Sequence, residues 1–378
     1  MNKIIQNFKN ISYGPAPEDS KDVMLWIKSL KYPNHLFING KWVKSKSSKK
    51  IKVINPATNK KLTTLAVSNK SDVNEAVGAA KKAFTSWSKT SSDTRAKYLY
   101  ALARLIQKHS RFLSVLETID NGKPIRETRD IDIPLVARHF YYHAGWAKKI
   151  NTNTQKPIGV IGQIIPWNFP LLMLAWKIAP AIASGNTVVL KPAEFTSLTA
   201  LYFAELCQKA KIPKGVINII TGDGSTGEFI TSHRDTKKIA FTGSTEVGKK
   251  IIQSSAEQEK KLTMELGGKS PFIVFEDADL DSAVEGVVDA IWFNQGQVCC
   301  AGSRLLVQES VEKLFIKKLK ARMEKLRVGN PLDKSIDIGA IVAPVQLKKI
   351  QSIVKKGEKE GSKLWQPSWA CPSDGLFC

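Results

Sequence analysis

Apolar and polar residues follow two different patterns along the chain, and the change comes near Pro157. Before it, apolar residues recur at the three- and four-residue spacing of amphipathic helices. This spacing predicts three helices, at 71–87, 93–118 and 134–150. Two short apolar runs around Asn39-Gly40 predict a β-hairpin over 35–43. Further short strands are predicted at 51–58 and 61–68.

After Pro157, short apolar runs alternate with segments that are each long enough for one helix. The runs lie at 159–166, 186–192, 215–221, 238–243 and 261–268. Strands that alternate with helices predict a parallel sheet with right-handed crossovers. We therefore expect a doubly wound α/β fold of the nucleotide-binding type.

The strand–helix pattern restarts at 271–277, so we place a domain boundary near Gly267-Gly268. The predicted parts are an N-terminal extension (1–34), a nucleotide-binding domain (35–267) and a second α/β domain (268–378). The last segment has no periodicity and no closing helix. The second domain is therefore expected to be incomplete.

Length and composition exclude several classes of protein. The chain has 378 residues, of which 43% are hydrophobic and 24% charged, as in a globular protein of about two domains. Its 5 cysteines show no CxxC spacing, which favours a reducing compartment. No apolar run approaches the roughly 18–20 residues of a membrane span, and the early Glu18 and Asp19 argue against a transit peptide. We expect a cytoplasmic protein that does not enter a membrane.

Neither the basic charge nor the histidines indicate a site. The formal net charge is +23, but the lysines are spread along the chain instead of forming one block, so no nucleic-acid partner is predicted. His139 and His143 have the spacing of a metal-binding pair. Because no acidic or cysteine ligand lies near them in the sequence, we predict no metal.

Two strand ends carry a pattern suited to binding a nucleotide. FTGSTEVG (241–248) places Gly243, Ser244 and Gly248 where a strand turns into a helix, whose N-terminus can bind phosphate. A plain strand-to-helix turn is the alternative. In VVLKPAE (188–194), Lys191 and Glu194 follow a parallel strand and are placed to contact ribose or phosphate, although a solvated charge has the same pattern.

Two further segments carry reactive groups. QGQVCCAGSR (295–304) sets two adjacent cysteines in a polar turn bounded by glycines, which suits a nucleophile better than an apolar setting would. Simple packing of the thiol is the alternative. MELGGKSP (264–271) places Glu265 at a strand end near the domain boundary, where a carboxylate can act as a general base or pair with a lysine at the surface.

Together with IIPWNFP (164–170), these segments resemble the aldehyde dehydrogenase superfamily, in its order and over roughly 35–378. The resemblance implies a Rossmann-type coenzyme domain and an α/β catalytic domain. Within the superfamily, FKNISYGPAPEDS and DLDSAVEGVVDA (279–290) resemble family 16, and particularly its A1-type member.

The resemblance implies oxidation of an aldehyde to a carboxylate. Cys299 matches the nucleophile, which forms a thiohemiacetal and then a thioester. Asn168 and the Cys299 backbone N–H match the donors to the oxyanion, and Glu265 matches the general base that activates water. The substrate is a small-molecule aldehyde that the sequence does not identify.

The resemblance also implies a nicotinamide cofactor. The positions that match the family's cofactor-binding residues, with Ile165 beside them, are Trp167, Lys191, Glu194, Gly224, Gly243, Ser244 and Gly248. Because the Glu194 carboxylate would repel a 2′-phosphate, NAD is favoured over NADP. The alternative is a catalytically impaired relative or truncated isoform that serves as a binding or scaffold protein. The retained Cys299, Glu265 and Asn168 favour the enzyme.

Two departures from the family pattern bear on assembly and length. Only residues 147–156 stand where the family has a long β-hairpin that builds subunit contacts. We therefore expect at most a homodimer, and not the usual tetramer. The sequence also stops before the family's Glu-x-Phe-Gly-Pro motif, so a C-terminal truncation is expected.

Overall fold

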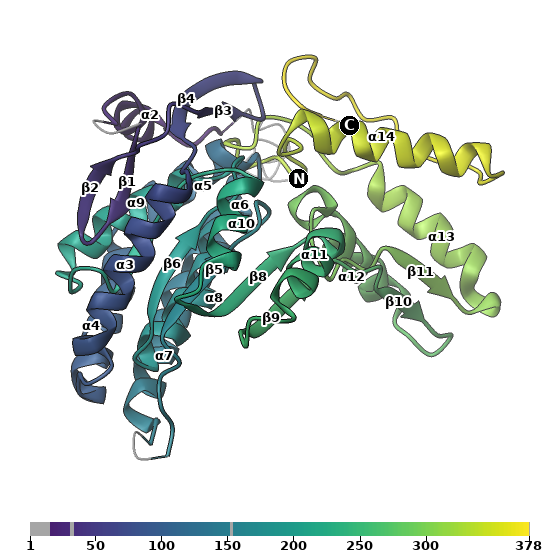
Figure 1. The fold of residues 1–378 in the computed structure, drawn as a ribbon. Coiled ribbons are helices and arrows are strands. Elements are labelled where there is room, and N and C mark those ends of the chain that lie inside the picture. Colours follow the sequence, from purple (N-terminus) through teal and green to yellow (C-terminus); the bar gives the residue numbers. More distant parts are fainter. Residues whose placement is uncertain (1–15, 31–33, 152–153, 378) are drawn as a thin grey trace, which may run out of the picture.

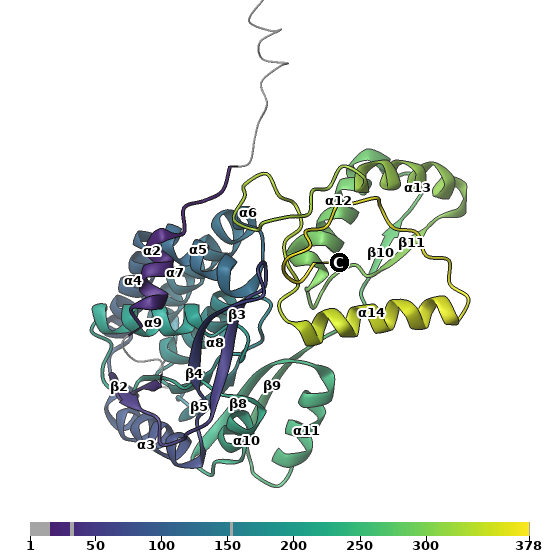
Figure 2. The ribbon, with the colours of Figure 1, turned by 90° about the horizontal axis from the view of Figure 1, so that it is seen from above.

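The computed structural model describes residues 16–30, 34–151 and 154–377. Figure 1 shows a large lobe built around one sheet and a smaller lobe that holds the C-terminal elements. Seen from above in Figure 2, helix α14 (Pro344–Lys359) runs along one side of the smaller lobe. The predicted N-terminal extension (1–34) and the predicted short connection (147–156) lie partly outside the described residues.

The central sheet has seven strands in the order β2-β1-β7-β6-β5-β8-β9. Their bounds are β1 His35–Ile38, β2 Lys41–Lys44, β5 Val160–Ile164, β6 Thr187–Lys191, β7 Ile217–Ile219, β8 Thr236–Gly243 and β9 Lys261–Leu266. The five strands from β7 to β9 pair in parallel, and the hairpin β1–β2 joins the edge of β7 in antiparallel register. The predicted hairpin and the predicted doubly wound parallel sheet are confirmed.

Helices cover both faces of this sheet (Figure 1). One face carries α3 (Lys70–Trp87), α10 (Gly224–Ser232) and α11 (Thr245–Ser255). The other face carries α8 (Pro170–Ala183) and α9 (Leu198–Lys209). An outer layer of α4 (Ser92–Lys108), α5 (Ser110–Asn121) and α7 (Ile133–Lys149) packs over those two helices. The crossover helices change face because strands are added first on one side of β5 and then on the other, and each crossover is right-handed.

Two predicted features of the first half differ from the structure. The helix predicted over 93–118 is two helices, α4 and α5, which part at His109. Helix α7 is preceded by a short turn of helix, α6 (Ile125–Glu127), and a π-helical turn over Thr128–Asp132 that the sequence pattern did not predict. Both differences arise where polar residues interrupt the apolar spacing on which the prediction depends.

Residues assigned to the N-terminal extension contribute to the main core. Helix α2 (Lys21–Lys28) buries Val23 and Ile27 in the largest hydrophobic cluster. The ring of Trp26 makes edge contacts with Phe112 and Tyr202, and its indole N–H donates to Glu205. The strands β3 (Lys50–Asn55) and β4 (Lys60–Ala66) form a separate antiparallel pair beside this core.

The smaller lobe has a core of its own. Strands β10 (Pro271–Val274) and β11 (Arg304–Val307) pair in parallel beneath α12 (Leu280–Trp292) and α13 (Glu309–Met323). The fully buried Phe315 lies in a cluster with Val274, Val284 and Val287 that is distinct from the main core. This arrangement fits a second α/β unit after residue 267, while the domain limits themselves stay predictions.

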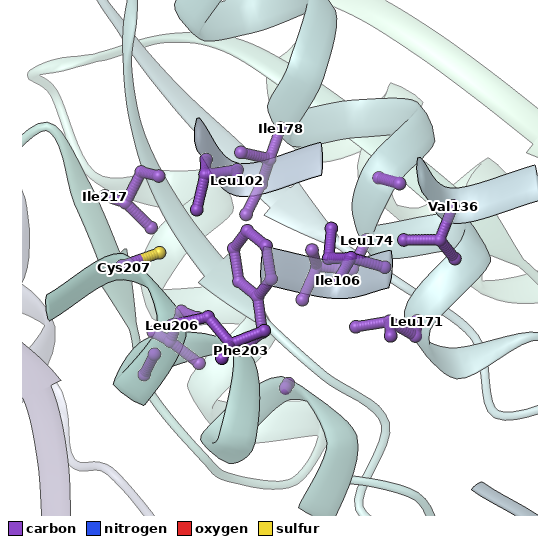
Figure 3. Packing of buried hydrophobic residues seen from close by; sticks show 14 of the residues in the cluster. Leu102, Ile106, Val136, Leu171, Leu174, Ile178, Phe203, Leu206, Cys207 and Ile217 are labelled. Carbon is purple, nitrogen blue, oxygen red and sulfur yellow. The ribbon is translucent and has the colours of Figure 1, made fainter. Parts of the chain in front are cut away.

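The main core of the large lobe lies between the sheet and the outer helices. Figure 3 shows the Phe203 ring of α9 at its centre, with Leu102 of α4, Ile178 of α8 and Ile217 of β7 around it. Phe203 has no exposed surface. This contact joins α9 both to the sheet and to the outer helical layer, so the position of the α8–α9 face depends on it.

Substitution of Phe203 by alanine should lower the free energy of unfolding by about 3–5 kcal/mol, because it removes buried apolar surface and leaves a cavity. Urea unfolding followed by circular dichroism measures the change. The matched control is Tyr142→Ala, at a side chain that is 60% exposed, for which the expected change is within about 0.5 kcal/mol. Similar losses in both variants would contradict the assignment of Phe203 to the core.

Candidate active site

The site lies where the order of the parallel strands reverses. The chain runs from β5 through β6 to β7 on one side, then returns to place β8 and β9 on the other side of β5. Loops leaving the carboxyl ends of β5 and β8 therefore diverge and leave a crevice between them, which is where open α/β sheets bind their ligands. Here the crevice is a cleft of about 900 Å³.

The cleft is lined by residues from four strand-to-helix connections. Of the predicted cofactor-binding residues, those that line it are Ile165, Trp167, Lys191, Glu194, Gly224, Gly243 and Ser244. Gly248 does not line the cleft. A methyl group on Gly248 would lie 2.6 Å from Leu266 Cδ2, so this glycine lets α11 pack closely on β9. A cofactor-binding role for Gly248 stays a prediction.

Lys191 is buried at the end of β6, with 4% of its surface exposed. Its ammonium donates to the carbonyl oxygens of Pro192 (2.7 Å) and Gly222 (3.0 Å) and lies 3.9 Å from Glu194 Oε2. Burial lowers the pKa of Lys191, and the charge of Glu194 opposes that change. The pair thus presents a fixed cation and a more exposed carboxylate to the cleft.

Two helices begin at the cleft, and their N-termini differ in charge. Helix α10 begins at Gly224 and is capped by the carboxylate of Asp223, which accepts from the Ser225 N–H and hydroxyl. These hydrogen bonds lower the pKa of Asp223 despite its partial burial. Helix α11 is capped by the neutral Ser244 hydroxyl, which accepts from the Val247 N–H. The cap of α11 is therefore neutral whereas that of α10 is a carboxylate, and Glu246 in the first turn of α11 is paired with Lys250 at 2.9 Å.

The predicted oxyanion donor and the cysteine loop are in direct contact. Asn168 Nδ2 donates to the Gln297 carbonyl oxygen at 2.9 Å. An amide nitrogen carries two hydrogens, so one remains for another acceptor. Asn294 also donates, through Nδ2, to the Asn168 carbonyl oxygen at 2.7 Å. Residues after β5 and residues after α12 are thereby joined into one unit.

Cys299 lies in the turn that follows these contacts and is exposed, as is Cys300. Partial burial of the thiol raises the pKa of Cys299, and the neighbouring Cys300 adds to the rise. A methyl group on Gly268 would lie 3.7 Å from the Cys299 carbonyl oxygen, so the Gly-Gly segment after β9 passes beside the cysteine loop. The segment that follows β9, the strand of Glu265, thus lies close to the backbone of the cysteine loop.

Glu265 lies on β9 opposite Thr242 of β8. Lys177 of α8, 8% exposed, donates from its ammonium to Thr242 Oγ1 at 2.6 Å. Burial lowers the pKa of Lys177 to about 8, and the negative charge of Glu265 partly offsets this. Lys177 is therefore a further titratable side chain near Glu265, and the sequence analysis did not identify it. Its signal was a single lysine within the apolar run of α8.

Within the described ranges, no group of three or more histidine, cysteine, aspartate or glutamate residues could hold a metal ion. None of the described helices is both long enough and apolar enough to cross a membrane.

A cleft at the carboxyl edge of a doubly wound sheet, with a buried lysine in its lining, is typical of nucleotide-binding α/β proteins. Residues 42–377 match the model of the aldehyde dehydrogenase family. The chain belongs to this family, and it is an oxidoreductase of the aldehyde dehydrogenase type.

The relatives agree in sequence and in structure. The mitochondrial aldehyde dehydrogenase of Rattus norvegicus is 44% identical over 380 aligned positions, which cover 96% of this chain and 72% of that protein. An aldehyde dehydrogenase of Agaricus bisporus is 43% identical, covering 90% and 72%. The NAD+ complex of an aldehyde dehydrogenase from Bacillus cereus superposes with a TM-score of 0.91 at 38% identity, covering 96% and 76%.

Proposed function

We propose that the protein oxidises an aldehyde to a carboxylate with NAD as hydride acceptor and Cys299 as covalent nucleophile. One observation carries this proposal: the Asn168 amide is bonded to the loop that leads into Cys299. The end of β9, which carries Glu265, passes beside the same loop. The proposed nucleophile, oxyanion donor and carboxylate thus belong to three parts of the chain whose backbones approach one another.

In this mechanism the Cys299 thiolate attacks the aldehyde carbonyl carbon and forms a thiohemiacetal oxyanion. The second hydrogen of the Asn168 amide and the Cys299 backbone N–H donate to that oxyanion as its charge develops. Because the pKa of Cys299 is raised, the thiol must lose its proton to a base before it attacks. After hydride loss leaves a thioester, Glu265 takes a proton from the attacking water.

The residues at the cleft fit NAD. A cleft of about 900 Å³ lies within the range of roughly 300–1,000 Å³ usual for cofactor sites. The N-terminus of α11 would hold the diphosphate, because its neutral cap Ser244 lines the cleft, whereas the cap of α10 is the carboxylate Asp223. The Lys191–Glu194 pair would contact the adenosine ribose. Bound NAD supplies the hydride acceptor. The solved Bacillus cereus relative was found with NAD+, which supports the same cofactor here.

Several finer assignments remain predictions that rest on sequence alone. They are the resemblance to family 16, the domain limits at 34 and 267, a homodimer in place of a tetramer, and a cytoplasmic location. The rat relative is named as mitochondrial, so location needs its own measurement. A role as a scaffold without catalysis has no observation in its favour.

The first experiment concerns cofactor choice. NAD should bind more tightly than NADP, and Glu194→Ser should narrow the difference by about tenfold or more, since like charges in contact cost several kcal/mol. Calorimetric titration measures both affinities. The matched control is Glu228→Ser, another glutamate of the same cleft. The placement of Glu194 at the ribose would be contradicted if the unmodified protein bound NADP more tightly than NAD. It would also be contradicted if only the Glu228 variant showed a smaller difference between the two affinities.

The second experiment identifies the nucleophile. The substitution Cys299→Ala should abolish dehydrogenase and esterase activity, whereas Cys300→Ala should leave most of both. Adjacent residues of a turn point in different directions, so only one thiol faces the reacting carbonyl. Initial rates of NADH formation and ester hydrolysis test this. An inactive Cys300 variant would shift the assignment by one residue.

The third experiment separates the two chemical stages. Glu265→Gln should slow thioester hydrolysis by roughly 10²–10⁴-fold, which is the usual contribution of a general base. Stopped-flow absorbance should show a burst of NADH followed by slow turnover. Glu276→Gln, at an exposed glutamate that accepts from the Ser310 hydroxyl, should behave like the unmodified enzyme. Loss of the burst itself would mean that Glu265 acts before hydride transfer.

A further inference from the structure

A cluster of ionisable side chains is buried between α5 and α7, behind the proposed active site. It consists of Glu117, Asp120, Lys123, Glu127 and Asp132, each with at most 5% of its surface exposed. Burying charged groups is costly unless they are paired and hydrogen-bonded. None of these side chains has a part in the proposed chemistry, so the cluster calls for a different explanation.

Lys123 is the only cation in this set and has no exposed surface. Its ammonium donates to Asp132 Oδ2 at 2.5 Å. It also lies 3.7 Å from the centre of the Phe169 ring and 5.5 Å from that of Phe293. The two rings are nearly parallel, at 23° and 6.0 Å between centres. Cations are attracted to aromatic faces at these distances, most strongly where water is excluded.

The two rings belong to the segments that carry the proposed chemistry. Phe169 directly follows Asn168, the proposed oxyanion donor. Phe293 directly precedes Asn294, which begins the turn toward Cys299. A single ammonium group therefore contacts both segments, one from the β5 side of the site and one from the α12 side.

The other members of the cluster hold the same two segments. Glu127 Oε2 accepts from the Asn294 backbone N–H at 2.9 Å. Glu117 Oε2 accepts from the Leu171 N–H at 3.2 Å, in the first turn of the helix after Asn168. The contacts of three cluster members thus converge on the segment after β5 and the turn before Cys299.

We propose that Lys123 is a positioning residue that fixes the Asn168 amide relative to the cysteine loop, by holding the Phe169 and Phe293 rings and the Asp132 carboxylate. This inference rests on the proposed role of Asn168. Displacement of a reacting group by about 1 Å can slow a reaction on the order of 10²-fold. A small shift of either ring would therefore be measurable as a rate.

The test must avoid leaving one charge buried without its partner, which would destabilise the fold for an unrelated reason. The double variant Lys123→Met with Asp132→Asn removes both charges and keeps similar side-chain volumes. Replacing both members of a buried pair is often neutral for stability. The NADH burst should slow by about 10–10²-fold, whereas the NAD dissociation constant should change less than twofold. The cleft lining includes none of these residues.

The same substitutions in an Asn168→Ala background show whether Lys123 acts through Asn168. Groups that act as a unit are non-additive, so the double change should slow the Asn168→Ala burst by less than twofold. If Asn168→Ala leaves the burst unchanged, the proposed role of Asn168 fails. If Asn168→Ala slows the burst but Lys123→Met with Asp132→Asn, made without Asn168→Ala, does not, only the positioning proposal fails. Equal slowing in both backgrounds also overturns it.

Two further variants separate positioning from stability. Asp120→Asn is the matched control, because Asp120 is equally buried but accepts from the Leu198 N–H and contacts neither segment of the site. It should leave the burst rate unchanged even if the midpoint of thermal unfolding moves. If the double variant does not fold, Phe293→Leu removes one ring and keeps the ion pair. A burst slowed tenfold in that variant supports the proposal, and an unchanged burst overturns it.

Discussion

The site depends on one geometric constraint, which is that the carboxyl ends of parallel strands meet at the same edge of a sheet. The order β7-β6-β5-β8-β9 places the ends of β5, β6, β8 and β9 together at that edge. Trp167 follows β5, Lys191 ends β6, and Gly243 ends β8. Residues distant in sequence therefore line one cleft. The reversal of strand order on either side of β5 opens the crevice there and nowhere else along the parallel strands.

Electrostatics at this edge are set by burial as much as by charge. Lys177 and Lys191 are both buried, and burial lowers the pKa of each. Carboxylates oppose the effect of burial at both lysines, Glu265 at Lys177 and Glu194 with Asp223 at Lys191. Glu265 and Glu194 are assigned to different steps of the proposed function. One carboxylate lies at the proposed hydrolytic end and the other at the proposed ribose end, so a change in either lysine would alter one function more than the other.

The periodicity and the strand-end motifs of the sequence predicted the main sheet and part of the cleft lining. Five parallel strands and the hairpin at Asn39-Gly40 were predicted from apolar runs and a turn signal. The strand-end motifs supplied four of the seven cleft-lining residues, namely Lys191, Glu194, Gly243 and Ser244, and the family resemblance supplied Ile165, Trp167 and Gly224. It did not predict the cluster around Lys123, because five charged residues at a helix end have the pattern of an exposed turn. Their burial arises only when α5, α7 and the two active-site segments pack together. Helix α2 was missed similarly, since only Val23 and Ile27 of its turns are buried.

The turn before Cys299 shows why such a cluster is needed. Asn294 and Gln295 have φ angles of 49° and 55°, and Gly296 follows at 75°. Left-handed conformations cost roughly 1–2 kcal/mol for each residue other than glycine. A turn of this kind persists only where its surroundings determine it.

The turn before Cys299 is held by partners from both lobes. Gln295 Nε2 donates to the carbonyl oxygens of Gly122 and Ala340, while Asn294 is held through its side chain and its N–H. These partners come from both lobes, so the thiol loop takes its shape only when the lobes are joined. Its geometry is a property of the assembled fold and not of the QGQVCC segment alone.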